Sequence, residues 1–382
     1  MKLRFRKKRK RKWYFKKFLW TLFGFVIVGI IAGLLFMYFH PVFGGSPREE
    51  QQAAYEELDN YVEGEFINET EKESEMGLTS IGGLIWDWVT EREDRIPSED
   101  VPVAPLDWEQ INSEADSLTW FGHSNFLLSI DNKKILIDPA FDDMASPVSF
   151  VGSRRFTEDI FHLIEELPRI DAVFITHDHY DHLDYPSILA LKEKTDHFFV
   201  PLGVDAHLME WGVASGDITP MNWWEQVEWE GLDIAAVPAR HSSNRSIFDR
   251  NQTLWAGFVI SGENTNLYVS GDTGYGDHFI EIGETYGPFD LTLMEGGQYD
   301  ERWPDAHMFP EESVQANMDA KGDVMMLMHW GAFSLALHGW SEPVERGIEE
   351  AEKQGVSIIA PQIGETVDLE ELDLTITPWW DF

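Results

Sequence analysis

The chain has 382 residues, a length that fits either one large α/β unit with extensions or two to three ordinary domains. Hydrophobic residues make up 43% of it, which excludes a disordered chain, and the absence of Cys excludes disulfides, Cys-ligated zinc, iron–sulfur clusters and a thiol nucleophile. Of the 29 basic residues, 11 lie in the first 17 positions, so residues 18–382 carry 18 basic against 68 acidic residues. Such a surface repels phosphate backbones, and we expect no nucleic-acid partner.

An apolar segment follows the basic cluster. Phe18 to Phe39 is 22 residues without a formal charge, and a helix of this length crosses a hydrocarbon core of about 30 Å. A cleaved signal peptide has a shorter apolar region and ends in a small-residue site, whereas His40 follows here, so we predict a retained signal anchor. The basic flank predicts a cytoplasmic tail at 1–17 and a single-pass cell-membrane protein whose large domain lies outside the cytoplasm. Gly29 and Gly33 fit the G-x-x-x-G pattern, which leaves a homodimer open.

The segment after the predicted span is acidic and polar. Residues 40–106 are rich in Glu, Asp, Ser and Gly, with three prolines near the end, so we predict an arm or linker that precedes a domain at 107–382. Apolar residues between Leu78 and Val89 predict that part of this arm docks on the domain.

Short apolar runs and helical patterns alternate in the rest of the chain. Phe126 to Ile130 and Lys134 to Ile137 flank the turn Asp131-Asn132, which indicates a hairpin. Asp171 to Thr176 is a near-continuous apolar strand, typical of a strand that is buried on both faces. Further strand candidates are Val227 to Trp229, Leu232 to Val237, Leu254 to Ser261, Asn266 to Ser270, Leu291 to Met294, Val324 to Met328 and Ser357 to Ile359, and helix candidates are Thr157 to Leu167, Pro310 to Ala320 and Glu342 to Gln354. The pattern predicts a layered α/β sandwich of roughly one large domain.

A histidine-rich string directly follows the buried strand. His177, His179 and Asp181 alternate in an extended loop and therefore face the same side, and His182 follows at the bend. Three imidazoles and a carboxylate within six residues indicate a metal site, because a cation offsets the cost of gathering them. The competing interpretation is a polar surface loop with coincidental histidines. Three further ligand candidates each follow a predicted strand: His241, Asp272 and His329.

The order of these residues resembles a known family. H-x-H-x-D-H, followed by His, then Gly-Asp, then His, is similar to the metallo-β-lactamase superfamily. Six strings resemble the branch that contains N-acylphosphatidylethanolamine-hydrolysing phospholipase D: Gly64–Asn68, Thr119–Ser124, Ile135–Pro139, Gly271–Tyr275, His307–Glu312 and His329–Phe333. The resemblance implies a four-layer αββα metallo-β-lactamase-like sandwich, here preceded by one N-terminal transmembrane helix.

The resemblance also implies two zinc ions at the sheet edges. The implied ligands are His177, His179 and His241 for one ion, Asp181, His182 and His329 for the other, and Asp272 for both. Imidazole nitrogen and carboxylate oxygen suit zinc, and another divalent metal such as iron or manganese stays open.

Two metals lower the pKa of a shared water toward about 7, so the resemblance implies hydrolysis. The predicted catalytic residues are Asp181, Asp272 and His307, and either Asp272 or His307 guides a proton toward the leaving alkoxide. His307 also fits a phosphate contact or simple polarity at a helix start. Asp138 either orients a metal-bound histidine or caps a turn, and His123 has no assigned chemistry.

We therefore expect a membrane-anchored, dinuclear-zinc phosphodiesterase that acts on lipid head groups. One alternative is a small-molecule lactonase, esterase or phosphoesterase of the same fold, whose specificity lies in loops 242–252 and 298–305. An alternative from another class is a non-catalytic envelope interaction or metal-sensing protein. Trp223, Trp224 and Trp229 are candidates for an interfacial patch or for the core.

Overall fold

The computed structural model describes residues 2–70, 83, 86–88, 90 and 94–382. The chain divides into two compact units, Met1–Phe43 and Gly44–Phe382. The predicted docking of Leu78 to Val89 falls largely outside the described residues.

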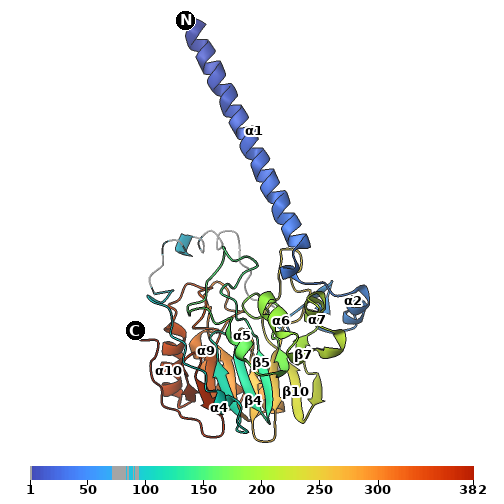
Figure 1. Ribbon diagram of the computed structural model, residues 1–382, viewed down its shortest axis with the longest axis vertical. Coiled ribbons are helices and arrows are strands. Elements are labelled where there is room, and N and C mark those ends of the chain that lie inside the picture. The colour runs from blue at the N-terminus through green and yellow to red at the C-terminus, as the bar shows by residue number, and fades with distance from the viewer. Residues whose placement is uncertain (1, 71–82, 84–85, 89, 91–93) are drawn as a thin grey trace. The chain divides into compact units, whose positions relative to one another are not determined.

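The first unit is a long helix. Helix α1 (Lys2–Phe39) is followed by the short 3-10 helix η1 (Pro41–Phe43) (Figure 1). The helix ends at Phe39, as the sequence predicts. The next residue, His40, precedes Pro41, and a residue before proline disfavours helical backbone. Its segment Trp13–Phe39 is long and apolar enough to cross a membrane. The helix also includes the basic residues of the predicted tail.

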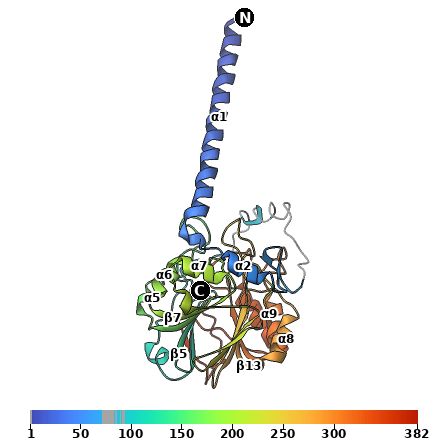
Figure 2. The same cartoon turned by 90° about the vertical axis from the view of Figure 1, so that its right-hand side faces the viewer.

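Two seven-stranded mixed sheets form the centre of the second unit (Figures 1 and 2). In spatial order, the first sheet contains β16 (Thr366–Asp368), β3 (Ser117–Trp120), β4 (Phe126–Ile130), β5 (Lys133–Ile137), β6 (Ile170–Phe174), β7 (Thr195–Pro201) and β8 (Ile218–Met221). The second contains β15 (Ser357–Ile359), β14 (Gly322–Met328), β13 (Phe289–Glu295), β12 (Asn266–Val269), β11 (Gly257–Ser261), β10 (Leu232–Val237) and β9 (Gln226–Trp229).

The strand directions decide which chain segments meet. The β4–β5 hairpin is confirmed, and its turn residues Asp131 and Asn132 have φ values of 49° and 63°, as a two-residue hairpin turn requires. Strands β5, β6, β7 and β8 are parallel, and so are β12, β13, β14 and β15. The carboxyl ends of β5, β6 and β7 therefore lie at one edge of the first sheet.

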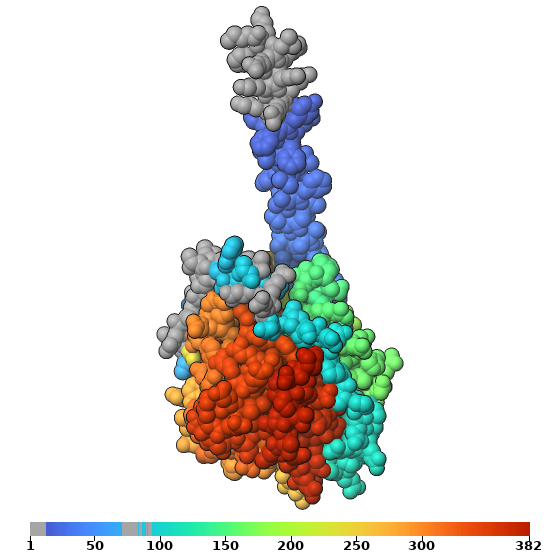
Figure 3. Space-filling model, turned by 90° about the vertical axis from the view of Figure 1, so that its left-hand side faces the viewer, coloured from blue at the N-terminus to red at the C-terminus, as the bar shows by residue number. Residues whose placement is uncertain are grey.

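Helices cover the outer faces of both sheets, which confirms the four-layer αββα sandwich. The first sheet is covered by α4 (Trp108–Ile111), α5 (Leu163–Glu166), α6 (Tyr185–Leu191) and α7 (Val204–Glu210), the last followed by the 3-10 helix η2 (Ser215–Asp217). The second is covered by α8 (His278–Thr285), α9 (Pro310–Asp319) and α10 (Glu342–Gln354), and Figure 3 shows the outer face that α10 and the C-terminal segment help to form. The inner faces of the two sheets form one hydrophobic core, and a second core lies under the helices of the first sheet.

One predicted helix is much shorter than expected. The pattern at Thr157 to Leu167 predicts eleven helical positions, whereas α5 contains only Leu163–Glu166. Val101 pairs with Thr157 as an isolated parallel bridge, so the start of the segment is held in an extended conformation. In contrast, α10 has the predicted bounds and α9 ends one residue early.

The segment predicted as an arm contributes side chains to the core. It contains α2 (Glu49–Tyr55), β1 (Tyr61–Val62) and β2 (Glu65–Phe66), and the two strands form a small antiparallel sheet. Tyr55, Tyr61 and Phe66 are buried, and their rings contact one another in edge-to-face or tilted arrangements. This segment therefore folds as part of the second unit.

The three candidate interfacial tryptophans belong to the core. Trp223 is buried and donates a hydrogen bond to the carbonyl of Trp255 over 2.6 Å. Trp224 and Trp229 are partly buried and pack against the same inter-sheet core. An apolar surface, if the domain has one, must come from other residues.

Candidate metal centre

The ends of four strands bring the candidate ligands to one edge of the sandwich. Strand β6 leads into the loop 177–182, β10 leads to His241, β12 to Asp272 and β14 to His329. Because side chains at the carboxyl ends of neighbouring strands converge, the structure brings together all seven residues that the sequence singled out. Their polar atoms form overlapping groups that can hold a metal ion.

The first group, which we name cluster A, consists of His177, His179, His241 and Asp272. Nε2 of His177 lies 2.9 Å from Nδ1 of His179, and Nε2 of His241 lies 3.3 Å from the same atom. Oδ2 of Asp272 lies 3.8 Å from Nε2 of His177 and 3.7 Å from Nε2 of His241. Three imidazole nitrogens and one carboxylate oxygen thus face a common point.

The second group, cluster B, consists of Asp181, His182 and His329, together with His123. Nε2 of His329 lies 3.2 Å from Oδ2 of Asp181 and 3.1 Å from Oδ2 of Asp272. Asp272 therefore faces both clusters. Nε2 of His123 lies 2.7 Å from Oδ2 of Asp181, which places this histidine against a candidate ligand.

Two buried atoms at the junction of the clusters indicate that the donor set fits a metal. Nε2 of His182 and Oδ1 of Asp272 lie 3.3 Å apart, and neither has a hydrogen-bond partner among the described residues. Buried polar atoms are almost always satisfied, so a cation is the natural partner of this pair. Imidazole nitrogens with carboxylate oxygens form the donor set that divalent transition metals bind.

Buried carboxylates support the histidines of cluster B. Oδ2 of Asp138 accepts a hydrogen bond from Nδ1 of His182 over 2.7 Å, and Oδ1 of Asp138 accepts from the backbone N–H of Thr176. Oε1 of Glu295, which is fully buried, lies 3.3 Å from Nδ1 of His329. Such partners fix the ring orientation of a ligating histidine and leave its Nε2 free for the metal.

The histidines of cluster A have neutral partners. Nδ1 of His177 lies 3.0 Å from the hydroxyl of Thr176, and Nδ1 of His241 lies 3.0 Å from the carbonyl of Ala306. The side chain of Asn68 clamps the backbone of His241, because its Nδ2 donates to the carbonyl and its Oδ1 accepts from the N–H, each over 3.0 Å. Asn68 reaches this position from the segment that was predicted as an arm.

The electrostatics of the two clusters differ accordingly. Burial and the neighbouring His182 hold the pKa of His177 well below its usual value. Burial lowers the pKa of His182 as well, but Asp272 and Asp181 outweigh it and hold that pKa well above its usual value. The pKa of His329 is raised to about 10, because Asp272 and Asp181 outweigh burial. Carboxylates thus raise the pKa of His182 and His329 in cluster B, whereas burial lowers the pKa of the neighbouring His123 to about 3.

His307 lies beside both clusters. Its Nδ1 is 3.2 Å from Oε1 of Glu295 and 4.0 Å from Oδ2 of Asp272. Its side chain is 14% exposed, whereas those of His177, His241 and Asp272 are at most 3% exposed, so His307 borders the accessible side of the centre.

The sequence did not identify two residues that hold the centre, Asn68 and Glu295. Glu295 is the last residue of β13, and the rule that singled out His241, Asp272 and His329 also applies to it. Asn68 ends the string Gly64–Asn68 that resembles the phospholipase branch, but the string assigns it no role, because its contact with His241 spans 173 residues. Asp138 orients His182 through a hydrogen bond to its Nδ1. His123, which had no assigned chemistry, lies within hydrogen-bond distance of Asp181.

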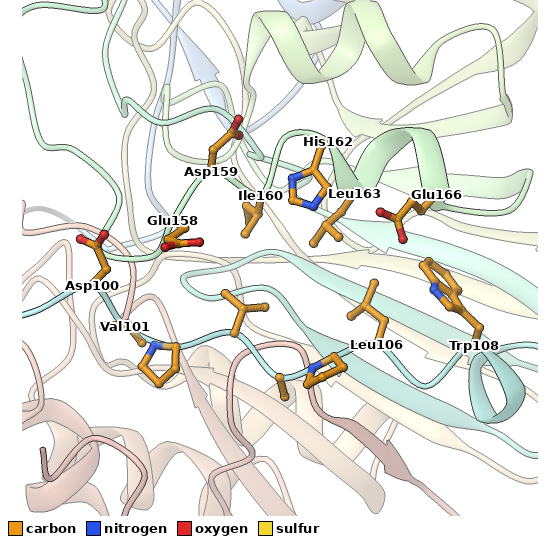
Figure 4. A pocket seen from close by; sticks show the side chains of 14 residues that line it. Asp100, Val101, Leu106, Trp108, Glu158, Asp159, Ile160, His162, Leu163 and Glu166 are labelled. Atoms are coloured by element: carbon orange, nitrogen blue, oxygen red, sulfur yellow. The ribbon is translucent and has the colours of Figure 1, made fainter.

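A separate groove of about 650 Å³ lies away from these ligands (Figure 4). Its walls are the extended segment 100–106 and the region around α5, with Glu158, Asp159, His162 and Glu166 on one side. None of the described residues that line it belongs to cluster A or cluster B.

Comparison with known proteins places this centre among metal-dependent hydrolases. Residues 133–330 match the family described as β-lactamase superfamily domain. An uncharacterized protein of Mycobacterium tuberculosis is 39% identical over 88% of this chain and 91% of its own. The N-acyl-phosphatidylethanolamine-hydrolyzing phospholipase D 1 of Caenorhabditis elegans is 33% identical over 68% of this chain and 77% of that protein. A metallo hydrolase of the archaeon Ignicoccus hospitalis has a TM-score of 0.51 at 25% identity, over 66% of this chain and 97% of that one.

Proposed function

Because the chain belongs to the metallo-β-lactamase superfamily, in the branch that resembles N-acylphosphatidylethanolamine-hydrolysing phospholipase D, we propose that it is a membrane-anchored, two-zinc phosphodiesterase. The chain is a metal-dependent hydrolase of this fold. The proposed substrates are membrane lipids whose head group is joined through a phosphodiester.

The observation that carries this function is the pair of adjoining clusters that share Asp272. We assign one zinc ion to cluster A and the other to cluster B. Two metal ions in such sites lower the pKa of a water that they share and stabilise negative charge on the reacting phosphoryl group. The side chains of the seven proposed ligands lie close enough together to hold metal ions, which supports an enzyme over a non-catalytic descendant of the fold.

His307 is the residue proposed to deliver a proton to the leaving alkoxide. Glu295 holds its Nδ1, so the opposite nitrogen, Nε2, is left to face a substrate. The partial exposure of His307 allows a leaving group to reach it, whereas the proposed ligands other than His179 are buried. A histidine in this position suits general acid catalysis near neutral pH.

The N-terminal helix supports a membrane location. The basic residues precede the apolar part of the helix, so the positive-inside rule favours a cytoplasmic N-terminus and an extracytoplasmic hydrolase domain. An anchored site meets lipid at a high effective concentration.

Product analysis tests the function. We would give the zinc-loaded full chain vesicles of N-acylphosphatidylethanolamine, a lactone and a simple phosphodiester, and identify products by mass spectrometry. The expected products are phosphatidic acid and N-acylethanolamine, and Asp272→Ala should abolish both, because it removes the carboxylate shared by the clusters. Asp277→Ala, at an exposed position five residues away, is the matched control and should remain active.

The other outcomes separate the alternatives. Turnover of the lactone or the simple phosphodiester alone would replace the lipid substrate with a small molecule. No turnover by a folded chain that holds two metal equivalents would favour a metal-sensing or interaction protein. Full activity of Asp272→Ala after metal depletion would contradict the metal-dependent mechanism.

A further inference from the structure

Two loops of the domain expose adjacent hydrophobic side chains. Phe150 and Val151 are 83% and 58% exposed, and Ile247 and Phe248 are 75% and 64% exposed. Single exposed apolar residues are common on any soluble surface. Adjacent pairs at the tips of two loops need another explanation, because exposed apolar clusters mark surfaces that bind a partner or a membrane.

Both loops begin at the metal centre. One follows β5 and starts directly after Asp138, and the other starts directly after His241. Asp138 supports His182 of cluster B, and His241 belongs to cluster A. The two apolar tips therefore rise from the same edge of the sandwich that holds the candidate ligands.

The chain also enters the domain at this edge. Gly44, the first residue of the second unit, packs so closely on His207 of α7 that an added Cβ would lie 2.1 Å from Nδ1. Nε2 of His207 in turn lies 3.4 Å from Oδ2 of Asp178, the residue between His177 and His179. Figures 1 and 2 show α6 and α7 at the same end of strands β5 and β7.

The connection to the candidate membrane span is short. The span ends at Phe39 and the second unit begins at Gly44, so the five steps between their Cα atoms reach at most about 18 Å. If α1 crosses a bilayer, the entry point of the domain stays near the lipid head groups.

We propose that the domain docks on the bilayer with its metal-bearing edge, and that Phe150, Val151, Ile247 and Phe248 enter the interfacial region. This inference rests on the proposed membrane-anchored lipid hydrolase and specifies how it meets its substrate. The strongly acidic domain is not attracted to anionic head groups, so apolar side chains provide the contact that charge does not. A lipid phosphodiester then reaches the metal centre from the membrane surface without leaving the bilayer.

The lack of cysteine in the chain allows a direct test. We would reconstitute the full chain in phosphatidylcholine vesicles as the single-cysteine variants Phe150→Cys, Phe248→Cys and Leu374→Cys, each labelled with an environment-sensitive fluorophore. Leu374 is 49% exposed and is the control, because it follows β16, whose last residue pairs with Ser117 at the opposite edge. Each label is then challenged with a nitroxide on the lipid chains and with iodide in the water.

Labels at 150 and 248 should shift to shorter emission wavelengths and lose emission to the lipid-borne nitroxide, whereas the label at 374 should lose emission to iodide. Iodide quenching at all three positions would overturn the proposal. Protection of 150 and 248 from both quenchers would indicate a protein partner, such as a second copy, and would overturn it as well. A chain that does not float with the vesicles contradicts the required span.

A second measurement separates docking from catalysis. The double variant Phe150→Ser, Val151→Ser should lose hydrolysis of vesicle lipid but keep hydrolysis of a short-chain, water-soluble phosphodiester, because neither residue belongs to the metal clusters or to loops 242–252 and 298–305. Equal loss on both substrates would contradict docking. Failure of the wild-type chain on every phosphodiester would remove the proposed reaction, while the quenching pattern would still decide which edge faces the lipid.

Discussion

Cluster A and cluster B contain similar candidate ligands but differ in the groups that hydrogen-bond to their histidines. The histidines of cluster A contact a hydroxyl, a backbone carbonyl and the amide of Asn68, whereas those of cluster B contact the buried carboxylates of Asp138 and Glu295. Cluster B also contains a second carboxylate among its candidate ligands, that of Asp181. Neighbouring sites in one protein can therefore differ in cation affinity through their supporting residues, and we expect cluster B to fill first and to empty last.

The largest effect is expected when the buried carboxylate charges of Asp138 and Glu295 are removed. Asp138→Asn and Glu295→Gln keep the side-chain shape but remove the carboxylates behind His182 and His329. We expect zinc affinity at cluster B to fall by about 10- to 100-fold, with little change at cluster A. Zinc titration against a competing chromophoric chelator measures both sites.

Asp116→Asn is the matched control for these variants. Asp116 is a buried carboxylate that accepts hydrogen bonds from Asp131 and Thr265, outside both clusters. The variant Asp116→Asn should leave zinc binding at both clusters unchanged. Equal losses at both clusters in Asp138→Asn would show that the charge acts on the whole centre and would break the comparison.

A smaller effect is expected at cluster A. Asn68→Ala removes two neutral hydrogen bonds to the backbone of His241, and a neutral hydrogen bond contributes about 1 kcal/mol. Two such bonds correspond to at most about a 30-fold loss of zinc affinity at cluster A, and we expect none at cluster B. Asn60→Ala, which removes a hydrogen bond to Asn222 in the same segment, is the control. A loss confined to cluster B would contradict the assignment.

The smallest effect concerns stability near cluster A. Burial, with a contribution from Arg240, lowers the pKa of His278 to about 3, so this histidine is neutral when folded and takes up a proton on unfolding below pH 6.5. The contribution of neutral His278 to the free energy of unfolding is therefore fully present above pH 6.5 and is lost as the pH falls toward 3. Between pH 6.5 and 5.5 the free energy of unfolding should decrease by about 1 kcal/mol through this group.

Thermal or denaturant unfolding of His278→Gln across this pH range measures that contribution. The variant should show the shallower dependence on pH, whereas His162→Gln, at an exposed histidine, should follow the wild type. Parallel curves for wild type and His278→Gln would show that His278 does not titrate on unfolding.

Local signals account for what the sequence predicted well. A buried strand followed by polar side chains is visible in the sequence, so β6 and its ligand-rich loop could be placed, as could α10 with its amphipathic pattern. The start of the predicted helix at Thr157 was wrong because its pairing with Val101, more than 50 residues away, outweighs local helical spacing. The role of Asn68 was missed for the same reason, since it depends on a contact that only the folded chain creates.

The clamp from Asn68 to His241 has a consequence for the order in which the protein matures. Asn68 is made early by the ribosome, but it can hold His241 only after strand β10 exists, and cluster B is incomplete until residue 329 has been made. Contacts between residues so distant in sequence carry a large loop-closure cost. We therefore expect the centre to bind metal only after the domain has been synthesised, in the compartment in which the chain completes its fold.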